Sequence, residues 1–326
     1  TQAGENTINQ IAIGVFQSSG AVNTIEELKA EDGFIGSREI YCSPGQANEV
    51  IVVANAPEGL FTGVTNKNDF IAKTVTLAST QRTVDGVPMA EQNHKNLPMS
   101  GQTTGVELKA GISSPVTVKL HRLVARISIK NIEADFSENI AFPNARLTID
   151  HIFLYRALAV SKTAPGDATQ TMPDNAQADP AMWIHGATAT AGIWQRETVY
   201  ILDELVPTVD VTAAKYTKNH WFYTFANNIQ SHATRLVIAG MFKENPTATP
   251  QRTYYPIVVN KKQAGTTISS GTGDGTIARN MLYNISATIK NKGIDDPGGE
   301  MDPASIKLMV EVQEWEKGID QDVVIE

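Results

Sequence analysis

The chain has 326 residues, 41% of them apolar and 19% charged, which is a globular composition and argues against a disordered or fibrous protein. Because domains usually hold about 100 to 150 residues, this length predicts two domains. The net charge of -8 at pH 7 offers no basic surface to a nucleic-acid backbone and disfavours contact with acidic membranes. No run approaches the ~18 apolar residues of a membrane span, and no signal region opens the chain, so an exported protein would be in its mature form.

Apolar residues alternate with a period of two through most of the chain, which predicts β-strands with one buried face. Loops rich in Thr, Ser, Asn, Gly and Pro separate the runs, and long helical crossovers are missing. The pattern predicts an all-β protein made of sandwiches with antiparallel pairing. The clearest runs are residues 11–15, 50–53, 147–154, 236–238, 257–259 and 285–289.

Helix is expected to be minor. Residues 24–29 are one candidate, because Thr24 and Glu27 have the spacing of a capping box. Residues 70–77 are another, after a possible cap at Asn68.

The only cysteine, Cys42, lies in EIYCSPGQ, where a strand leads into a turn. A single cysteine excludes an intramolecular disulfide and a thiolate zinc site. We interpret Cys42 as a small buried apolar residue rather than as a nucleophile.

The buried face changes phase within residues 116–131. Val116, Val118 and Leu120 occupy even positions, whereas the apolar residues from Leu123 onward occupy odd ones. Either a β-bulge at His121 and Arg122 restores the register, or two separate strands meet there at a bend.

The domain boundary is predicted after residue 159, because residues 161–180 become polar, contain proline and lose all periodicity. This gives domains 1–159 and 160–326, although the polar stretch could also be a long loop within the second domain. Residues 261–276 read as a flexible surface loop.

The C-terminus holds two strand candidates. The first has Ile306, Leu308, Val310 and Val312 on one face, and the second contains Val323, Val324 and Ile325. Residues 293–303, with two prolines and two adjacent glycines, break regular structure ahead of both. A strand at a free chain end can complete the sheet of another molecule.

No catalytic, cofactor or metal site is predicted. The histidines show no metal-binding spacing, and the sequence has neither a nucleophile elbow nor a phosphate-binding loop. Asp274 and the group Asp295, Asp296 and Asp302 match no EF-hand, so we interpret them as solvated loop residues. Four tryptophans could hold a sugar, but packing in a core or interface explains them more simply: Trp183, Trp194, Trp221 and Trp315.

The order of several segments resembles the fimbrillins, the major fimbrial subunits of Bacteroidales that build the type V pilus. The matching segments are INQIAIGVF, EIYCSPGQANEVIVVANAP, LPMSGQ, VKLHRLVARISIKN, RTYYPIVVN, IARNMLYNISATIKN and VEVQEWE, which together span residues 8–316. Residues 161–196 show no match.

The resemblance implies two transthyretin-like β-sandwich domains and no enzymatic activity. It implies a lipoprotein precursor carried to the outer membrane, where a protease removes an N-terminal strand after an arginine and opens a groove in the first domain. A C-terminal strand of a neighbouring subunit then fills the groove. The sequence begins at Thr1 without a lipobox, which is consistent with the trimmed form.

We therefore expect a structural pilus subunit, most simply the stalk protein, at the cell surface, with further copies and related subunits as partners. Both C-terminal strands are donor candidates, and packing within the home domain is the alternative for residues 306–312. Ile11, Ile13 and Val15 are expected on the strand that flanks the acceptor groove. A tip adhesin or surface lectin of the same architecture, binding a sugar or host protein, is the competing hypothesis, and an exported β-sandwich hydrolase has no motif behind it.

Overall fold

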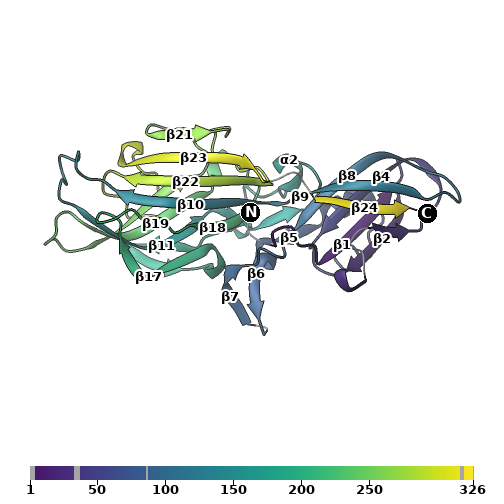
Figure 1. Cartoon of the computed structure of the whole chain (residues 1–326), viewed down its shortest axis with the longest axis horizontal. Helices are drawn as coiled ribbons and strands as arrows, with labels where there is room; N and C mark the ends of the chain where they lie inside the picture. Colours follow the sequence, from purple (N-terminus) through teal and green to yellow (C-terminus); the bar gives the residue numbers. More distant parts are fainter. Residues whose placement is uncertain (1–3, 33–36, 86, 316–318, 326) are drawn as a thin grey trace.

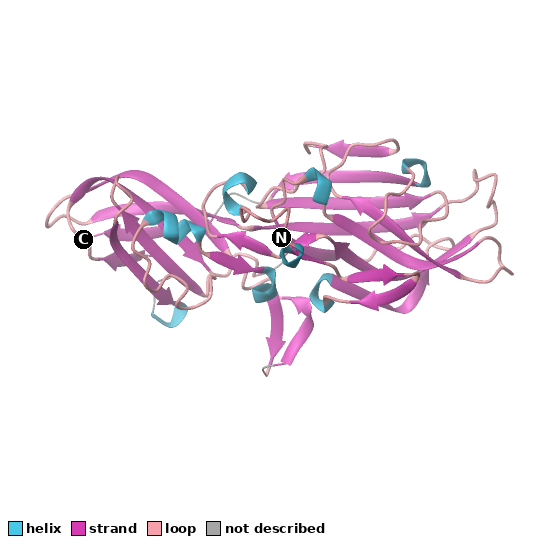
Figure 2. Cartoon of the chain, turned by 180° about the vertical axis from the view of Figure 1, so that it is seen from behind, coloured by secondary structure: helices cyan, strands magenta, loops and turns pink. Residues whose placement is uncertain are grey.

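The structure is a computed structural model, which describes residues 4–32, 37–85, 87–315 and 319–325. Figure 1 shows two β-rich lobes joined end to end along the long axis of the molecule. The all-β class and the sandwich-like layers are confirmed, and only short helices accompany them (Figure 2). The α-helices are α1 (Lys67–Ala72) and α2 (Ala168–Thr171). The short 3-10 helices are η1 (Ala30–Asp32), η2 (Leu77–Thr80), η3 (Pro180–Met182), η4 (Val199–Ile201), η5 (Gln230–His232) and η6 (Pro303–Ser305).

The N-terminal lobe is built on one seven-stranded sheet in the order β2-β1-β4-β8-β9-β24-β3. Its strands are β1 (Gln10–Phe16), β2 (Val22–Lys29), β3 (Ser37–Ile40), β4 (Gly45–Ala54), β8 (Met99–Leu108), β9 (Ser114–Arg122) and β24 (Ile319–Ile325). The last of these comes from the other end of the chain.

The C-terminal lobe contains two sheets. The five-stranded sheet has the order β18-β10-β22-β23-β21, and the four-stranded sheet has the order β17-β11-β19-β20. The first is formed by β10 (Val124–Ala134), β18 (His220–Phe225), β21 (Thr266–Ser269), β22 (Met281–Ile289) and β23 (Ile306–Glu314). The second is formed by β11 (Arg146–Tyr155), β17 (Leu202–Asp210), β19 (Arg235–Lys243) and β20 (Gln251–Val258).

Four two-stranded ribbons complete the fold, and the β6-β7 hairpin projects from the region where the two lobes meet (Figures 1 and 2). The pairs are β6 (Gln81–Val84) with β7 (Val87–Gln92), β5 (Thr74–Thr76) with β13 (Val160–Lys162), β12 (Ala157–Leu158) with β14 (Trp183–Ile184), and β15 (Ala187–Thr190) with β16 (Ile193–Arg196).

Both helix predictions need correction. Residues 24–29 lie in strand β2 rather than in a helix, because pairing with the buried strand β1 outweighs the local capping signal. The Glu27 carboxylate instead accepts hydrogen bonds from the backbone N–H groups of Gly59 and Phe61. The second helix exists but begins earlier, at Lys67 behind an Asn66 cap, and ends at Ala72.

The phase change at residues 116–131 marks a passage between the lobes. Strand β9 ends at Arg122 in the N-terminal sheet and β10 begins at Val124 in the five-stranded sheet, so the two-strand alternative is confirmed. The predicted irregular stretch 261–276 also contains a short strand, β21.

The expected boundary after residue 159 does not coincide with the sheet pairing, since β10 and β11 both pair with strands of the C-terminal lobe. We therefore propose a boundary near Leu123. Pairing is also not wholly antiparallel: β10-β22, β21-β23 and β24-β3 are parallel pairs. Between β10 and β22 the chain builds the other sheet of the sandwich, which provides a crossover without a long helix.

Candidate functional site

The C-terminal strand β24 lies inside the N-terminal sheet, between β9 and β3. Figure 1 shows β24 within the lobe formed by the N-terminal strands. It runs antiparallel to β9, with Ile319 opposite Leu120 and Ile325 opposite Ser114. On its other side it runs parallel to β3, from Asp322 opposite Ser37 to Ile325 opposite Ile40. The chain therefore completes its own first lobe with its own tail.

The two faces of β24 differ in chemistry. Val323 and Ile325 are buried to 0% and 1% exposure, and Val323 pairs with the buried Val116 of β9. The opposite face is polar, because the Thr117 hydroxyl donates to the Asp322 carboxylate at 2.6 Å and Lys119 Nζ lies 3.7 Å from the Asp320 carboxylate. An apolar inner face with a complementary charged outer face sets the register of the inserted strand.

Strand β3 depends on this insertion. Among the described residues its only sheet partner is β24, and β9 pairs with β8 only at Met99 and Ser100. Removing β24 would leave β3 and most of β9 with open backbone hydrogen-bonding groups beside an apolar trough. The slot between β9 and β3 is therefore a candidate acceptor groove.

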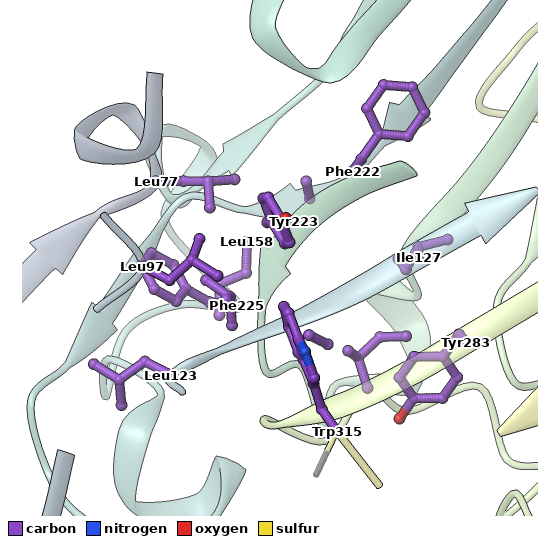
Figure 3. Close-up of a cluster of buried hydrophobic side chains, with 14 of the residues drawn as sticks. Leu77, Leu97, Leu123, Ile127, Leu158, Phe222, Tyr223, Phe225, Tyr283 and Trp315 are labelled. Atoms are coloured by element: carbon purple, nitrogen blue, oxygen red, sulfur yellow. The ribbon is translucent and has the colours of Figure 1, made fainter. Parts of the chain in front are cut away.

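Trp315, one residue after β23, anchors the base of the tail at the junction of the lobes. It is fully buried, and its ring stacks on Tyr223 with centroids 5.7 Å apart and planes 8° apart. The Arg122 guanidinium lies 4.4 Å and that of Arg126 5.3 Å from the same ring. Figure 3 shows Trp315 and Tyr223 with Leu77 and Leu97 of the first lobe and Ile127 of the second.

The Glu5 carboxylate joins the N-terminal segment to this tail base. It lies 2.7 Å from Arg126 Nη1, and it accepts hydrogen bonds from the Tyr223 hydroxyl at 2.8 Å and the Trp315 indole N–H at 3.3 Å. Arg122 Nε also donates to the Glu5 carbonyl at 3.2 Å. Burial and the Glu5 carboxylate raise the pKa of the Tyr223 hydroxyl, which therefore remains a hydrogen-bond donor.

A second buried cation, Arg279, ties β8 and β9 to the C-terminal lobe. Its guanidinium donates to the backbone carbonyls of Ser100, Arg122 and His121, and burial lowers its pKa to about 9, so it still carries its charge at neutral pH. Burial, followed by the nearby Arg279 charge, lowers the pKa of His121. Two buried, hydrogen-bonded arginines, Arg122 and Arg279, thus lie at the junction of the lobes.

We predict that Glu5→Ala lowers the free energy of unfolding by about 3 to 5 kcal/mol, because it leaves the largely buried Arg126 charge and the buried Tyr223 hydroxyl without their acceptor. Chemical denaturation of the purified chain measures this. Glu204→Ala is the control, since Glu204 pairs with Arg196 at the exposed surface and its loss should leave the unfolding midpoint unchanged. Equal shifts for the two variants would contradict the role assigned to Glu5.

The predicted donor residues separate into two places. Ile306, Leu308, Val310 and Val312 lie in β23, are at most 4% exposed and pack in the home sheet between β22 and β21. Val323 and Ile325 face the core of the first lobe, whereas Val324 lies on the outer face and is half-buried. The expected hinge near Gly318 lies outside the described residues.

The predicted groove flank does not adjoin β24 in this chain, and its role toward a neighbouring subunit stays a prediction. Ile11, Ile13 and Val15 are buried in β1, but β4, β8 and β9 stand between that strand and β24. The sequence reasoning also missed Glu5 and the aromatic-arginine cluster at the junction. The sequence signal for β9, the strand that does neighbour β24, was the alternation of Val116, Val118 and Leu120.

The other candidate residues serve the fold. Burial, followed by the Glu26 charge, raises the pKa of the half-buried Cys42 thiol to about 11, so it stays protonated. Asp274 accepts from Thr272 and Thr276, and Asp302 caps η6. The described ranges contain no cluster of three or more possible metal ligands among His, Cys, Asp and Glu.

The four tryptophans form no shared exposed platform. Trp183 and Trp315 are buried, and Trp183 donates its indole N–H to the Ala176 carbonyl at 2.7 Å. Trp194 and Trp221 are half-buried on β16 and β18, which belong to different sheets. Within the described parts of the chain, no helix is long and apolar enough to cross a membrane.

A two-lobed β-sandwich protein whose terminal strand completes a sheet at the opposite end of the chain has the architecture of a pilin-like subunit. Residues 1–122 match the family model for the major fimbrial subunit protein (FimA), and residues 183–315 match that for the FimA4 pilin C-terminal domain. The chain is 25% identical over 344 aligned positions to the major fimbrium subunit FimA type-5 of Porphyromonas gingivalis, covering 92% of this chain and 80% of that one.

Solved structures share the fold. A fimbrilin (FimA) of Porphyromonas gingivalis W83 aligns with TM-score 0.67 at 19% identity, covering 96% of this chain and 92% of that one. A candidate cell adhesion protein of Parabacteroides distasonis ATCC 8503 aligns with TM-score 0.67 at 18% identity, covering 96% of this chain and 95% of that one.

The chain belongs to the fimbrillin family. It is a structural subunit of a cell-surface appendage that assembles with other fimbrial subunits, and it is not an enzyme.

Proposed function

We propose that this chain is a stalk subunit that polymerises by donor-strand exchange, with β24 of one copy filling the slot between β9 and β3 of the next. The observation that carries the proposal is the position of β24, a strand that follows the C-terminal lobe in the sequence yet completes a sheet made otherwise of residues 10–122. Release of β24 would leave the pairs β2-β1, β1-β4, β4-β8 and β8-β9 in place, while β3 would lose its described partner.

One chain holds both halves of the contact, the donor strand and the acceptor slot. Because these are different surfaces, the contact between two copies is heterologous and does not close, so it generates a filament. Possession of both halves favours a stalk role over a tip role, since a tip subunit needs only one. The scattered tryptophans give no support to the alternative lectin role.

The short link to the tail constrains the filament. Residues 316–318 separate Trp315 from Ile319, and four steps of extended chain reach at most about 14 Å. If Trp315 stays anchored at the lobe junction of the subunit that donates β24, the groove of the accepting subunit must begin within about 14 Å of Trp315. Successive copies then pack with their lobe junctions close together.

The maturation steps belong to the same proposal. In the precursor, as the family resemblance implies, a strand ahead of the present N-terminus occupies the slot until a protease removes it. The precursor is a lipoprotein that delivers the subunit to the outer membrane, where the filament is anchored. A strand held by main-chain hydrogen bonds and alternate apolar side chains can be replaced by another of the same pattern.

Deletion of residues 320–326 tests the proposal. The full chain is expected to form filaments by electron microscopy and heat-resistant ladders on gels, whereas the deleted chain forms neither. Because the deleted chain can accept but not donate, adding it in small amounts to the full chain should shorten the filaments. Equal polymerisation of both chains would overturn the donor role of β24.

A further inference from the structure

We infer that the β6-β7 hairpin is a second contact between successive copies of this chain, and this inference rests on the donor-strand function proposed above. The contacts of β24 with β9 and β3 are the same whether the groove belongs to its own chain or to the next one. They therefore cannot by themselves favour a filament over the self-complemented monomer.

The intramolecular arrangement has a large advantage. Because only three residues separate Trp315 from Ile319, the tail meets its own groove at an effective concentration on the order of millimolar. A filament formed at micromolar subunit concentration must overcome this preference, which is a factor of about a thousand. Contacts outside the groove have to supply that difference.

The hairpin has the surface for such a contact. Val84 and Val87 face each other across the ribbon and are 40% and 61% exposed, and Met89 is 37% exposed. Helix η4 packs against β7, and its Val199 is 36% exposed. Exposed apolar side chains gathered on one projecting element are typical of a protein-binding surface.

The hairpin also lies in the right place. Gln92 at its base accepts a hydrogen bond from the Tyr223 backbone N–H at 2.7 Å and donates to the Tyr223 carbonyl at 3.1 Å. Tyr223 stacks directly on Trp315, the anchor of the tail. The hairpin projects from the junction (Figure 2). Because the short link would hold the junctions of successive copies close together, the hairpin is placed to reach the neighbouring copy.

The sequence is suited to a rigid arm rather than a loose loop. Asp85 follows β6 with a positive φ of 50°, which is the backbone conformation of a tight type I′ hairpin turn. Arg82 and Glu91 form a cross-strand ion pair at 2.9 Å. A preformed arm loses little conformational entropy when it docks.

The test compares the double variant Val84→Asp/Val87→Asp with Ile193→Asp. Ile193 is 65% exposed on another two-stranded ribbon, β15-β16, and serves as the matched control. We expect the double variant to raise the critical concentration for polymerisation at least 100-fold, with the control unchanged. An unchanged critical concentration in the double variant would overturn the inference.

A synthetic peptide of residues 319–326 separates this inference from the donor-strand function. It is added to chains that lack residues 320–326, with and without the hairpin substitutions, and its binding is measured by calorimetry. Equal affinity for both chains supports a hairpin role outside the groove, whereas weaker binding to the hairpin variant would show that the substitutions act through the fold. Binding to neither chain would overturn the proposed function and the inference together.

Discussion

Val323→Asp is expected to abolish polymerisation, whereas Val324→Asp at the adjacent position should leave it nearly intact. Val323 is fully buried against β9, so the substitution loses about 1.5 to 3 kcal/mol of apolar burial and also buries a carboxylate without a partner. Together these cost at least about 3 kcal/mol, which lowers the affinity of the strand for its groove more than a hundredfold.

Val324 points to the outer face, where Asp320 and Asp322 already lie on the same strand. A carboxylate there stays hydrated, and its pairing with Glu39 adds about 0.2 to 1 kcal/mol of like-charge repulsion. Gel ladders and electron microscopy of the two variants measure the difference. Equal loss of polymerisation in both variants would show that β24 does not enter the groove with Val323 facing inward and Val324 facing outward, as it does in the monomer.

Gly101→Ala is expected to disable the acceptor. A Cβ built at this position in β8 would lie 2.1 Å from the Lys119 carbonyl oxygen of β9. That atom belongs to the backbone, so the strand itself must move, at a cost of about 1 to 3 kcal/mol or more. Strand β9 forms one wall of the slot for β24, and its displacement should lower both the stability of the first lobe and its affinity for the residue 319–326 peptide.

Gly105→Ala is the matched control, because it lies on the same strand and a Cβ there would meet nothing within 4 Å. Its positive φ of 72° still makes alanine unfavourable by about 1 kcal/mol. Peptide binding should therefore persist in this variant and fail in Gly101→Ala. Normal peptide affinity in both variants would mean that the close contact between Gly101 of β8 and Lys119 of β9 does not determine the shape of the groove.

Local patterning predicted the strands and the all-β class well, because alternation records which face of a strand is buried. It could not place β24, since Val323–Ile325 is a short apolar run whose partners, β9 and β3, lie some 200 to 285 residues earlier in the sequence. The same limit explains why Ile11, Ile13 and Val15 do not lie beside β24: alternation marks them as core, but sheet order is a property of long-range pairing.

The tail base was missed for a related reason. Glu5, Arg126, Tyr223 and Trp315 come from four distant segments, and nothing local marks Glu5 as a buried carboxylate. The helix expected at residues 24–29 failed differently, because a capping signal of about 1 kcal/mol is weaker than a full ladder of pairing with β1. The change of phase at His121 was informative, since it marked the passage between lobes.

Cross-linking between different copies tests the central claim most directly. Thr117 and Asp322 are paired across β9 and β24, with their side-chain oxygens 2.6 Å apart. One chain carries Thr117→Cys and the other Asp322→Cys, both with Cys42→Ser. The two chains are mixed under polymerising conditions and oxidised.

The control replaces the Asp322→Cys chain with a third chain that carries Ile140→Cys, at a fully exposed position in a loop of the C-terminal lobe. The account predicts disulfide-linked dimers of the first two chains on non-reducing gels, in step with filament growth and absent from the control. Filaments that form without this cross-link would contradict donor-strand exchange through β24.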